Sequence, residues 1–301
     1  MFVISRTHAR WAFKDLLGQA NHFLITILVG LNGIKANQIE MDPEFSTSWN
    51  PHDPKRSAER SRVFALDLAL VRAVDALDTY FMMSVRKPCA LADESFVAAM
   101  GATSRSVANR LDVFDEHLPS LEPSQIALLK LAIEWRNRRV HSLAEDRFVK
   151  AQRQLILAEH SELATSYSGL DVKALLTHFD GGMAPTFKEA ASIIRACHQA
   201  VEHYDSHILS GMPLTRYLCD SVLMILSEGN SDYQAAINRI WDHPKRRAKA
   251  LRLLRLAGVS EGHKRAGRRV TDCFVESFVS LTPQEVEDFL MTAHCDAEFS
   301  S

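Results

Sequence analysis

The chain has few cysteines for its length, and they are widely dispersed. Five cysteines occur among 301 residues, and no two of them form a CxxC pair or a cluster with histidine. The pattern therefore indicates neither a zinc site nor a disulfide framework, because both need closely spaced ligands or an even set of partners. Reduced and mostly buried thiols in a cytosolic protein fit the five positions, which are Cys89, Cys197, Cys219, Cys273 and Cys295.

Long hydrophobic runs are also absent. The most apolar run, Phe23 to Leu31, has nine residues, whereas about 20 are needed to span a bilayer. Basic residues precede this run as in a signal peptide, but the segment that follows, Asn32 to Ala36, lacks a small-x-small cleavage site. We therefore expect a cytoplasmic protein with no targeting segment and no membrane contact.

Alternating strand-like segments, low-complexity stretches and repeats of fixed period are missing as well. The clearest pattern is helical, because apolar residues recur at steps of three and four at Val63, Leu66, Leu70, Val74, Leu77 and Phe81. The sequence predicts an all-α fold with two parts. Residues 1–211 form an antiparallel helical bundle with its core at about 57–208, and residues 212–301 form a small helical C-terminal region.

Caps and helix breakers place the other helices. Pro123 suits the first turn of a helix, and Thr282 with Glu285 has the spacing of a capping box. A long proline-containing loop at about 35–55 separates the helix of the apolar stripe from an N-terminal one. The further helices are expected at about 11–31, 103–117, 187–208, 214–226, 231–241, 244–256 and 260–279.

The charge of the chain is balanced overall but not along its length. Net charge is −2, which neither requires nor excludes a polyanionic partner. Ten Lys or Arg against one acid occupy the basic segment 245–269, whereas seven acids and no Lys or Arg lie between Asp272 and Glu298. The basic segment therefore either contacts phosphate or docks an acidic surface, of this chain's tail or of a partner. Its candidates for nucleic-acid binding are Lys245, Arg246, Arg247, Lys249 and Arg252.

One polar motif stands at the end of a helix whose earlier turns are apolar. It reads Arg136-Asn137-Arg138-Arg139-Val140-His141. An Arg followed at this range by a His arises by chance about three times in a chain of this composition. Two other pairs of that kind, Arg110–His117 and Arg153–His160, lack the dense polar context. The context therefore singles the motif out, and the spacing does not.

At these residues the chain resembles the HEPN superfamily of helical-bundle nucleases. Their signature is Arg, a polar residue that is often Asn, three more residues and then His, on the third main helix of a four-helix bundle. Arg136, Asn137 and His141 stand at those positions, and the resemblance covers roughly residues 57–208. It implies a metal-independent endoribonuclease without a cofactor, often a toxin or antiviral-defence effector that an antitoxin or sensor protein restrains.

The residue types suit that chemistry. Histidine titrates near neutrality and can take the proton of a ribose 2′-hydroxyl, so His141 is the candidate base. Arginine stays charged and offers a fork of donors to phosphate oxygens, so Arg136 is the candidate phosphate contact. Asn137 and Arg138 are expected to support the site, and Arg139 to bind nucleic acid. The resemblance implies that the 2′-oxygen attacks the adjacent phosphorus and leaves a cyclic phosphate.

Helix geometry complicates a site built from one helix. Five residues rotate by about 500°, so Arg136 and His141 lie about 140° apart, whereas Asn137 and Arg138 share the face of His141 better. HEPN-like proteins commonly dimerise so that two motifs meet in one cleft. The resemblance therefore implies a homodimer that acts on RNA.

Other polar residues carry alternative interpretations. Asp67, Asp75 and Asp78 on the long helix either support the site, as the resemblance allows, or form a solvated face paired with Arg72. Of the histidines on the helix at 187–208, only His203 and His207 share a face, with no carboxylate pattern to complete a metal site, while His198 is set apart. We therefore expect no metal.

Two other kinds of protein remain in competition with the ribonuclease. Three arginines near a helix C-terminus are favourable against its dipole, so the motif is also consistent with a solvated basic helix end. On that interpretation the chain is a non-catalytic module whose bundle dimerises and whose basic segment docks a protein or nucleic-acid partner. A third interpretation is a nucleic-acid-binding regulator that uses the C-terminal helices.

Overall fold

A computed structural model describes residues 1–39, 44, 52–89, 93–141, 148–228, 232–262 and 267–292. Most of the predicted 35–55 loop lies outside these residues. So do the end of the acidic stretch after Thr292, Cys295, and the two basic residues Lys264 and Arg265. The fold is predominantly α-helical, as predicted.

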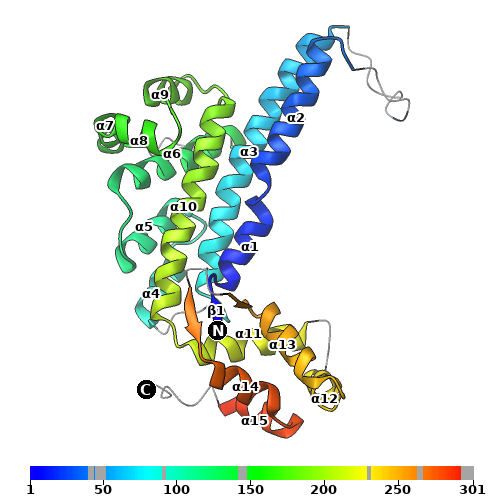
Figure 1. Cartoon of the computed structure of the whole chain (residues 1–301). Helices are drawn as coiled ribbons and strands as arrows, with labels where there is room; N and C mark the ends of the chain where they lie inside the picture. Colours follow the sequence, from blue (N-terminus) through cyan, green and yellow to red (C-terminus); the bar gives the residue numbers. More distant parts are fainter. Residues whose placement is uncertain are drawn as a thin grey trace.

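Long helices that run side by side form the upper body of the molecule (Figure 1). The longest is α3 (Pro54–Ser84), which carries the predicted apolar stripe, and α10 (Phe187–Gly211) packs beside it. Five of the six stripe residues are buried, and only Val63 at the N-terminal end of the stripe is exposed. The buried five are Leu66, Leu70, Val74, Leu77 and Phe81. Helix α6 (Pro123–Val140) begins at the predicted proline and packs against both of them.

The predicted N-terminal helix is in fact two helices, α1 (His8–Leu17) and α2 (Ala20–Lys35). They are separated at Gly18, where an added Cβ would stand 2.5 Å from the carbonyl oxygen of Lys14. Glycine alone fits that approach, so the chain can turn there. The stretch His8–Lys35 is long and apolar enough to cross a membrane by length and composition alone, a test that core helices and signal sequences also pass.

Shorter helices cover one flank of the long ones (Figure 1). The predicted helix at 103–117 is confirmed from Ser106 onward, because the Ser106 side chain accepts a hydrogen bond from the backbone of Asn109 and caps the N-terminus. The helices of this flank are α4 (Glu94–Ala102), α5 (Val107–His117), α7 (Lys150–Ala158), α8 (His160–Ser166) and α9 (Val172–Asp180).

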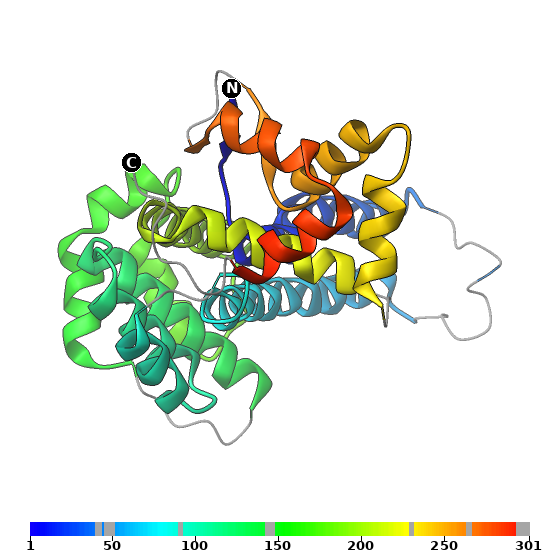
Figure 2. The same cartoon turned by 90° about the horizontal axis from the view of Figure 1, so that it is seen from below.

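The C-terminal region is a group of short helices below the long ones (Figures 1 and 2). The capping box at its last helix is confirmed, since Thr282 N–H donates to Glu285 at 2.7 Å and Glu285 N–H donates to the Thr282 hydroxyl at 3.3 Å. The helices are α11 (Leu214–Ser227), α12 (Tyr233–Trp241), α13 (Arg246–Leu256), α14 (Asp272–Ser280) and α15 (Pro283–Thr292).

A small antiparallel sheet corrects the purely helical prediction for this region. Strand β1 (Phe2–Ile4) lies between β2 (Val259–Glu261) and β3 (Arg268–Val270), and α14 starts only at Asp272. The predicted helix at 260–279 was therefore wrong over its first half. Strands of three residues are too short to show alternation, and their pairing depends on a partner at the other end of the chain.

The N-terminus contacts both parts of the chain, because β1 pairs with two strands of the C-terminal region and the residues after it reach α10 and α11. Thr7 N–H donates to the buried carboxylate of Asp205 on α10 at 3.1 Å, and the Thr7 hydroxyl donates to the same carboxylate. The backbone N–H of His8 donates to the hydroxyl of Tyr217 on α11 at 2.9 Å. One hydrophobic core runs through both parts of the chain. The predicted boundary near residue 211 stays a prediction.

Candidate active site

The motif lies where α6 emerges from the core. The helix is buried as far as Trp135, whose indole N–H donates to the carbonyl oxygen of Met183 at 2.9 Å. The next turn is partly exposed and polar, and His141 caps the C-terminus with its N–H donating to the carbonyl oxygen of Asn137 at 2.8 Å. The buried part of α6 therefore anchors a short polar end at the surface.

Arg136 is held in place by α3. Its Nη2 lies 3.2 Å from Oδ1 of Asp75, and its Nη1 donates to the Asn137 side chain at 3.1 Å. The Arg136 side chain is only 15% exposed. Its Nε is buried and has no hydrogen-bond partner among the described residues. Asp75 and Asn137 thus fix the guanidinium through its two terminal nitrogens, while the buried Nε has no partner among the described residues.

The two other arginines of the motif tie α6 to its neighbours. Arg139 makes a bidentate pair with Asp67, with donor–acceptor distances of 2.8 and 2.5 Å, and it also donates to the carbonyl oxygen of Gly182 at 2.8 Å. The hydrogen bonds that Arg139 donates to the carboxylate of Asp67 raise the pKa of Arg139 above its ordinary value. Arg138 donates to the carbonyl oxygen of Phe179 at 3.0 Å and lies 3.9 Å over that ring. Both side chains therefore contribute to packing.

His141 is the most accessible ionisable group of the motif. Its side chain is exposed, and within the described part of the chain it makes no hydrogen bond or ion pair. Its φ of −117° and ψ of 109° have left the helical region. The imidazole is therefore available to solvent at the end of α6, while Arg136 is clamped one turn earlier.

The acidic residues of α3 do not pair with Arg72, so that alternative interpretation was wrong. Asp75 and Asp67 pair with the motif arginines, and Asp78 pairs with Arg110 of α5. Arg72 donates instead to the carbonyl oxygen of Leu16. All three carboxylates point to arginines of other helices, because they lie on the α3 face that meets α5 and α6.

The arginines of the two other Arg–His pairs, Arg110–His117 and Arg153–His160, make structural contacts. Arg110 is buried, and besides its ion pair with Asp78 it donates to the carbonyl oxygen of Ser104 at 2.6 Å. Arg153 forms a two-pronged pair with Asp180 of α9. Arg110 shares with Arg136 an acid on α3 and an adjacent asparagine, Asn109, but its other hydrogen bonds go to Thr103 and Ser104. Arg153 has neither an acid on α3 nor an adjacent asparagine.

The histidines of α10 do not form a metal site in the described residues. His203 and His207 do come together, with ring centroids 4.8 Å apart, while His198 packs edge-on against Phe13. Nε2 of His203 lies 2.7 Å from the carbonyl oxygen of Pro119. No group of three His, Cys, Asp or Glu side chains arranged to hold a metal ion occurs where the chain is described.

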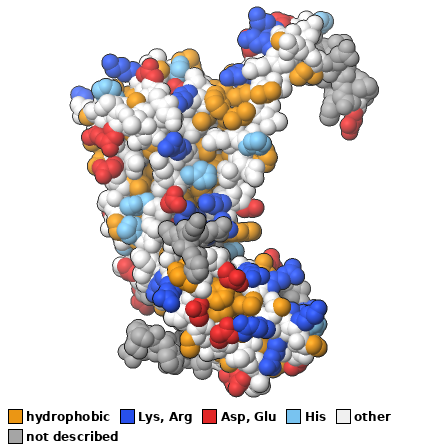
Figure 3. Space-filling model, in the orientation of Figure 1, with side chains coloured by type: hydrophobic (Ala, Val, Ile, Leu, Met, Phe, Trp, Pro, Cys, Tyr) orange, Lys and Arg blue, Asp and Glu red, His pale blue; other side chains and the backbone are white. Residues whose placement is uncertain are grey.

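The basic segment is divided between several contacts. Arg247 pairs with Glu276 of α14, and Lys249 donates to the carbonyl oxygen of Arg239 at 3.2 Å. The other three candidates, Lys245, Arg246 and Arg252, are exposed on or just before α13. Figure 3 shows Lys and Arg side chains gathered over the C-terminal region, with hydrophobic side chains between them.

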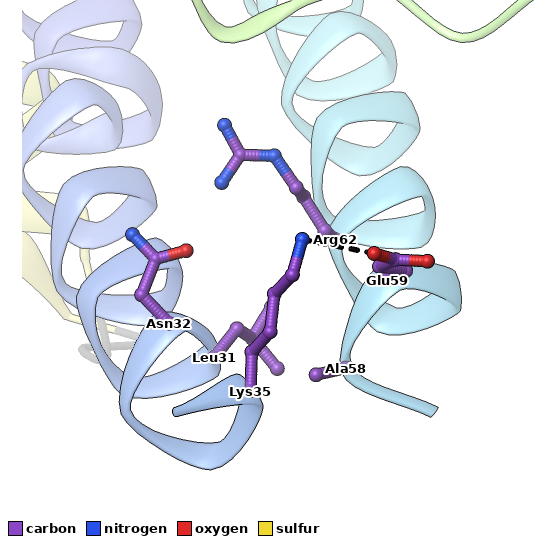
Figure 4. Close-up of a pocket in the computed structure, with 6 residues that line it drawn as sticks. All are labelled: Leu31, Asn32, Lys35, Ala58, Glu59 and Arg62. Carbon is purple, nitrogen blue, oxygen red and sulfur yellow. Dashed lines mark ion pairs between the residues drawn. The ribbon is translucent and has the colours of Figure 1, made fainter. Parts of the chain in front are cut away.

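A separate pocket of about 260 Å³ lies between α2 and α3, away from the motif (Figure 4). Lys35 and Glu59 form an ion pair of 2.9 Å across it. None of the motif residues lines this pocket, and its walls are Leu31, Asn32, Lys35, Ala58, Glu59 and Arg62. It therefore adds nothing to the candidate site.

Comparison with protein-family models, with curated proteins and with solved structures finds no match for the chain. No family is assigned by these comparisons, and the resemblance to HEPN nucleases stays an expectation from the sequence motif. The contribution of Asp67 and Asp75 to the motif was open at the level of sequence. Sequence spacing gave no signal for these pairs, because Asp67 and Asp75 lie eight residues apart on α3 whereas their partners Arg139 and Arg136 lie three apart on α6.

Proposed function

We propose that the protein is a metal-independent endoribonuclease with an HEPN-like helical bundle and with its active site at the end of α6. The observation that carries the proposal is the orientation of Arg136 by Asp75 and Asn137, one turn before an exposed His141. A fixed guanidinium and an accessible imidazole are the two groups that cleavage by the ribose 2′-hydroxyl needs.

In this mechanism His141 takes the proton of the 2′-hydroxyl, and the 2′-oxygen forms a bond to the adjacent phosphorus. The bond from phosphorus to the 5′-oxygen breaks, and that oxygen takes a proton from an imidazolium or from water. The products are a 2′,3′-cyclic phosphate and a 5′-hydroxyl. Arg136 stabilises the charge that develops on the phosphate through the second N–H of each terminal nitrogen, which Asp75 and Asn137 leave available. Asn137 and Arg138 keep the helix end in place.

A homodimer is part of the proposal, because exposed apolar side chains surround the motif. Phe64 and Leu68 are 71% and 54% exposed and share one face of α3, next to Asp67, which pairs with Arg139 of the motif. Val140, beside Arg139, is exposed too. Apolar groups of this size grouped at one place are typical of an interface. A second copy docked here brings two His141 side chains toward one cleft.

The proposed setting is a toxin or antiviral-defence effector in the cytoplasm. A protein partner, either an antitoxin or a sensor, restrains it until a trigger releases it. RNA is the proposed substrate, and no metal or cofactor takes part. This setting comes from the resemblance to HEPN nucleases.

A non-catalytic HEPN-like dimerisation and docking module is the competing function. The observation that favours it is that each motif arginine already has an intramolecular partner: Asp75 for Arg136, Phe179 for Arg138 and Asp67 for Arg139. On this alternative the motif serves stability and packing alone.

Cleavage of a fluorescent single-stranded RNA in EDTA separates the two functions. General acid–base catalysis contributes about 100-fold or more, so we expect His141→Ala to lose at least that factor. The matched control is His160→Ala, which removes the exposed histidine of the Arg153–His160 pair. The cleavage rate of this variant should stay within about twofold of the wild-type rate. A DNA oligonucleotide of the same sequence, which has no 2′-hydroxyl, should remain intact.

Two results contradict the proposal. Cleavage that persists equally in His141→Ala removes the assigned base. No cleavage by the wild type, with or without EDTA, at protein concentrations that keep it dimeric, supports the docking module instead. Thermal unfolding of each variant shows whether a loss of activity reflects a loss of folding.

A further inference from the structure

A groove in the C-terminal region combines an aliphatic floor with a basic rim. It lies between α11, α12 and α13, and its volume is about 320 Å³. Leu226, Ala236 and Leu253 are buried in its floor, while Leu256 on its edge is 63% exposed. The remaining lining residues are Ile225, Ile240, Arg239, Lys249 and Arg252.

The cations of the rim are not neutralised by acids within the described residues. No acid lines the groove, and neither Arg239 nor Arg252 makes an ion pair in the described part of the chain. Lys249 donates only to a backbone carbonyl oxygen, that of Arg239.

Two other arginines of α13 form ion pairs with acidic side chains. Arg247 pairs with Glu276, and Arg255 pairs with Glu261 at 2.8 Å. The sequence supplies acids to this region, yet none of them reaches the groove among the residues that the structure describes. Three positive charges around an apolar floor therefore remain to be matched by something else.

The lining identifies the kind of partner. Single-stranded nucleic acid is bound by stacking its bases on aromatic side chains, and none of the described residues that line this groove is aromatic. Aliphatic floors with a charged rim suit instead the apolar face of a helix, with leucine-like anchors at steps of three and four residues. Charge complementarity requires acids along the flanks of that helix.

We propose that the groove between α11, α12 and α13 binds an acidic amphipathic helix of a protein partner. Leu256 and the buried aliphatic floor take the apolar side chains of the partner. Arg239, Lys249 and Arg252 pair with its carboxylates. The site is separate from the end of α6 and does not depend on catalysis there, so it can hold a regulatory partner while the active site stays free.

A designed peptide tests this in the full-length protein. The probe is a fluorescein-labelled helix with leucines at positions one, four, five and eight and glutamates elsewhere, followed by fluorescence anisotropy at about 50 mM NaCl. We expect the double variant Arg239→Glu, Arg252→Glu to weaken binding at least about tenfold. The double variant Lys245→Glu, Arg246→Glu is the matched control, because it reverses two charges as well, at exposed residues that lie at the start of α13 and outside the groove. It should change affinity by less than about twofold.

Several outcomes overturn the proposal. Equal weakening by the control variant Lys245→Glu, Arg246→Glu shows attraction by charge alone. Equal binding of a peptide with the same residues in scrambled order shows the same. Tighter binding of a single-stranded RNA of equal charge, lost in the same double variant, makes the groove a nucleic-acid site. A tenfold gain in peptide affinity on removal of residues 293–301 shows that the chain's own tail is the occupant. Leu256→Ser should lower the affinity of the protein for the peptide. An unchanged affinity in that variant also contradicts the proposal.

Discussion

The buried carboxylate of Asp205 predicts a specific dependence of stability on pH. Asp205 has no exposed surface, and it receives hydrogen bonds from the N–H and the hydroxyl of Thr7. Burial raises its pKa from 3.8 to about 6, against the smaller opposing effect of these hydrogen bonds and of Arg10. The perturbation that isolates this effect is Asp205→Asn, because the amide oxygen can still accept from Thr7 N–H.

The sign follows from the protons that each state binds. Below about pH 4 the carboxyl is protonated in both the folded and the unfolded chain. Between about pH 4 and 6 the unfolded chain releases its proton while folded Asp205 keeps it, so stability falls as pH rises. The rise of the pKa from 3.8 to about 6 corresponds to a loss of about 3 kcal/mol of unfolding free energy. This loss has fully developed above about pH 6.

Urea unfolding at a series of pH values from 4 to 7 measures this. The unfolding free energy of the wild type minus that of Asp205→Asn should fall by about 3 kcal/mol over the series, since the other carboxyl groups cancel in the difference. Asp242→Asn, which removes the exposed carboxylate of another aspartate, serves as the control for the loss of a carboxylate as such. A flat or rising difference for Asp205→Asn refutes the reasoning.

Three further changes give distinct expected results. Arg110→Ala leaves Asp78 without its buried partner and should destabilise by about 3 kcal/mol in urea unfolding, with a loss under 1 kcal/mol counting against the role assigned to this ion pair. Thr186→Ala removes the N-cap of α10 and should cost about 1 kcal/mol in the same assay; no change in midpoint contradicts this. Phe64→Asp should convert a dimer into a monomer in light scattering, whereas Phe23→Asp, on the exposed side of α2, should not; a wild type that is monomeric contradicts the dimer face.

Local signals in the sequence were sufficient for most helices. The apolar stripe of α3, Pro123 at the start of α6, and the Thr282 capping box all depend on residues within a few positions of one another. Caps and helical periodicity act over one or two turns, so they can be read without the tertiary structure. The same locality explains the errors. The turn at Gly18 and the strand β1 depend on a close backbone approach and on a distant partner.

The residues of the motif show the same division. The sequence alone determined that a polar, arginine-rich end follows a buried helix, and that His141 closes it. Only the tertiary structure decided which arginine is clamped, because Asp75 and Asp67 lie more than 60 residues away on α3. It also decided that Arg239, Lys249 and Arg252 line one apolar groove while Arg247 is neutralised. Ion pairs and grooves form between helices, and the packing of helices against each other is what a local pattern does not contain.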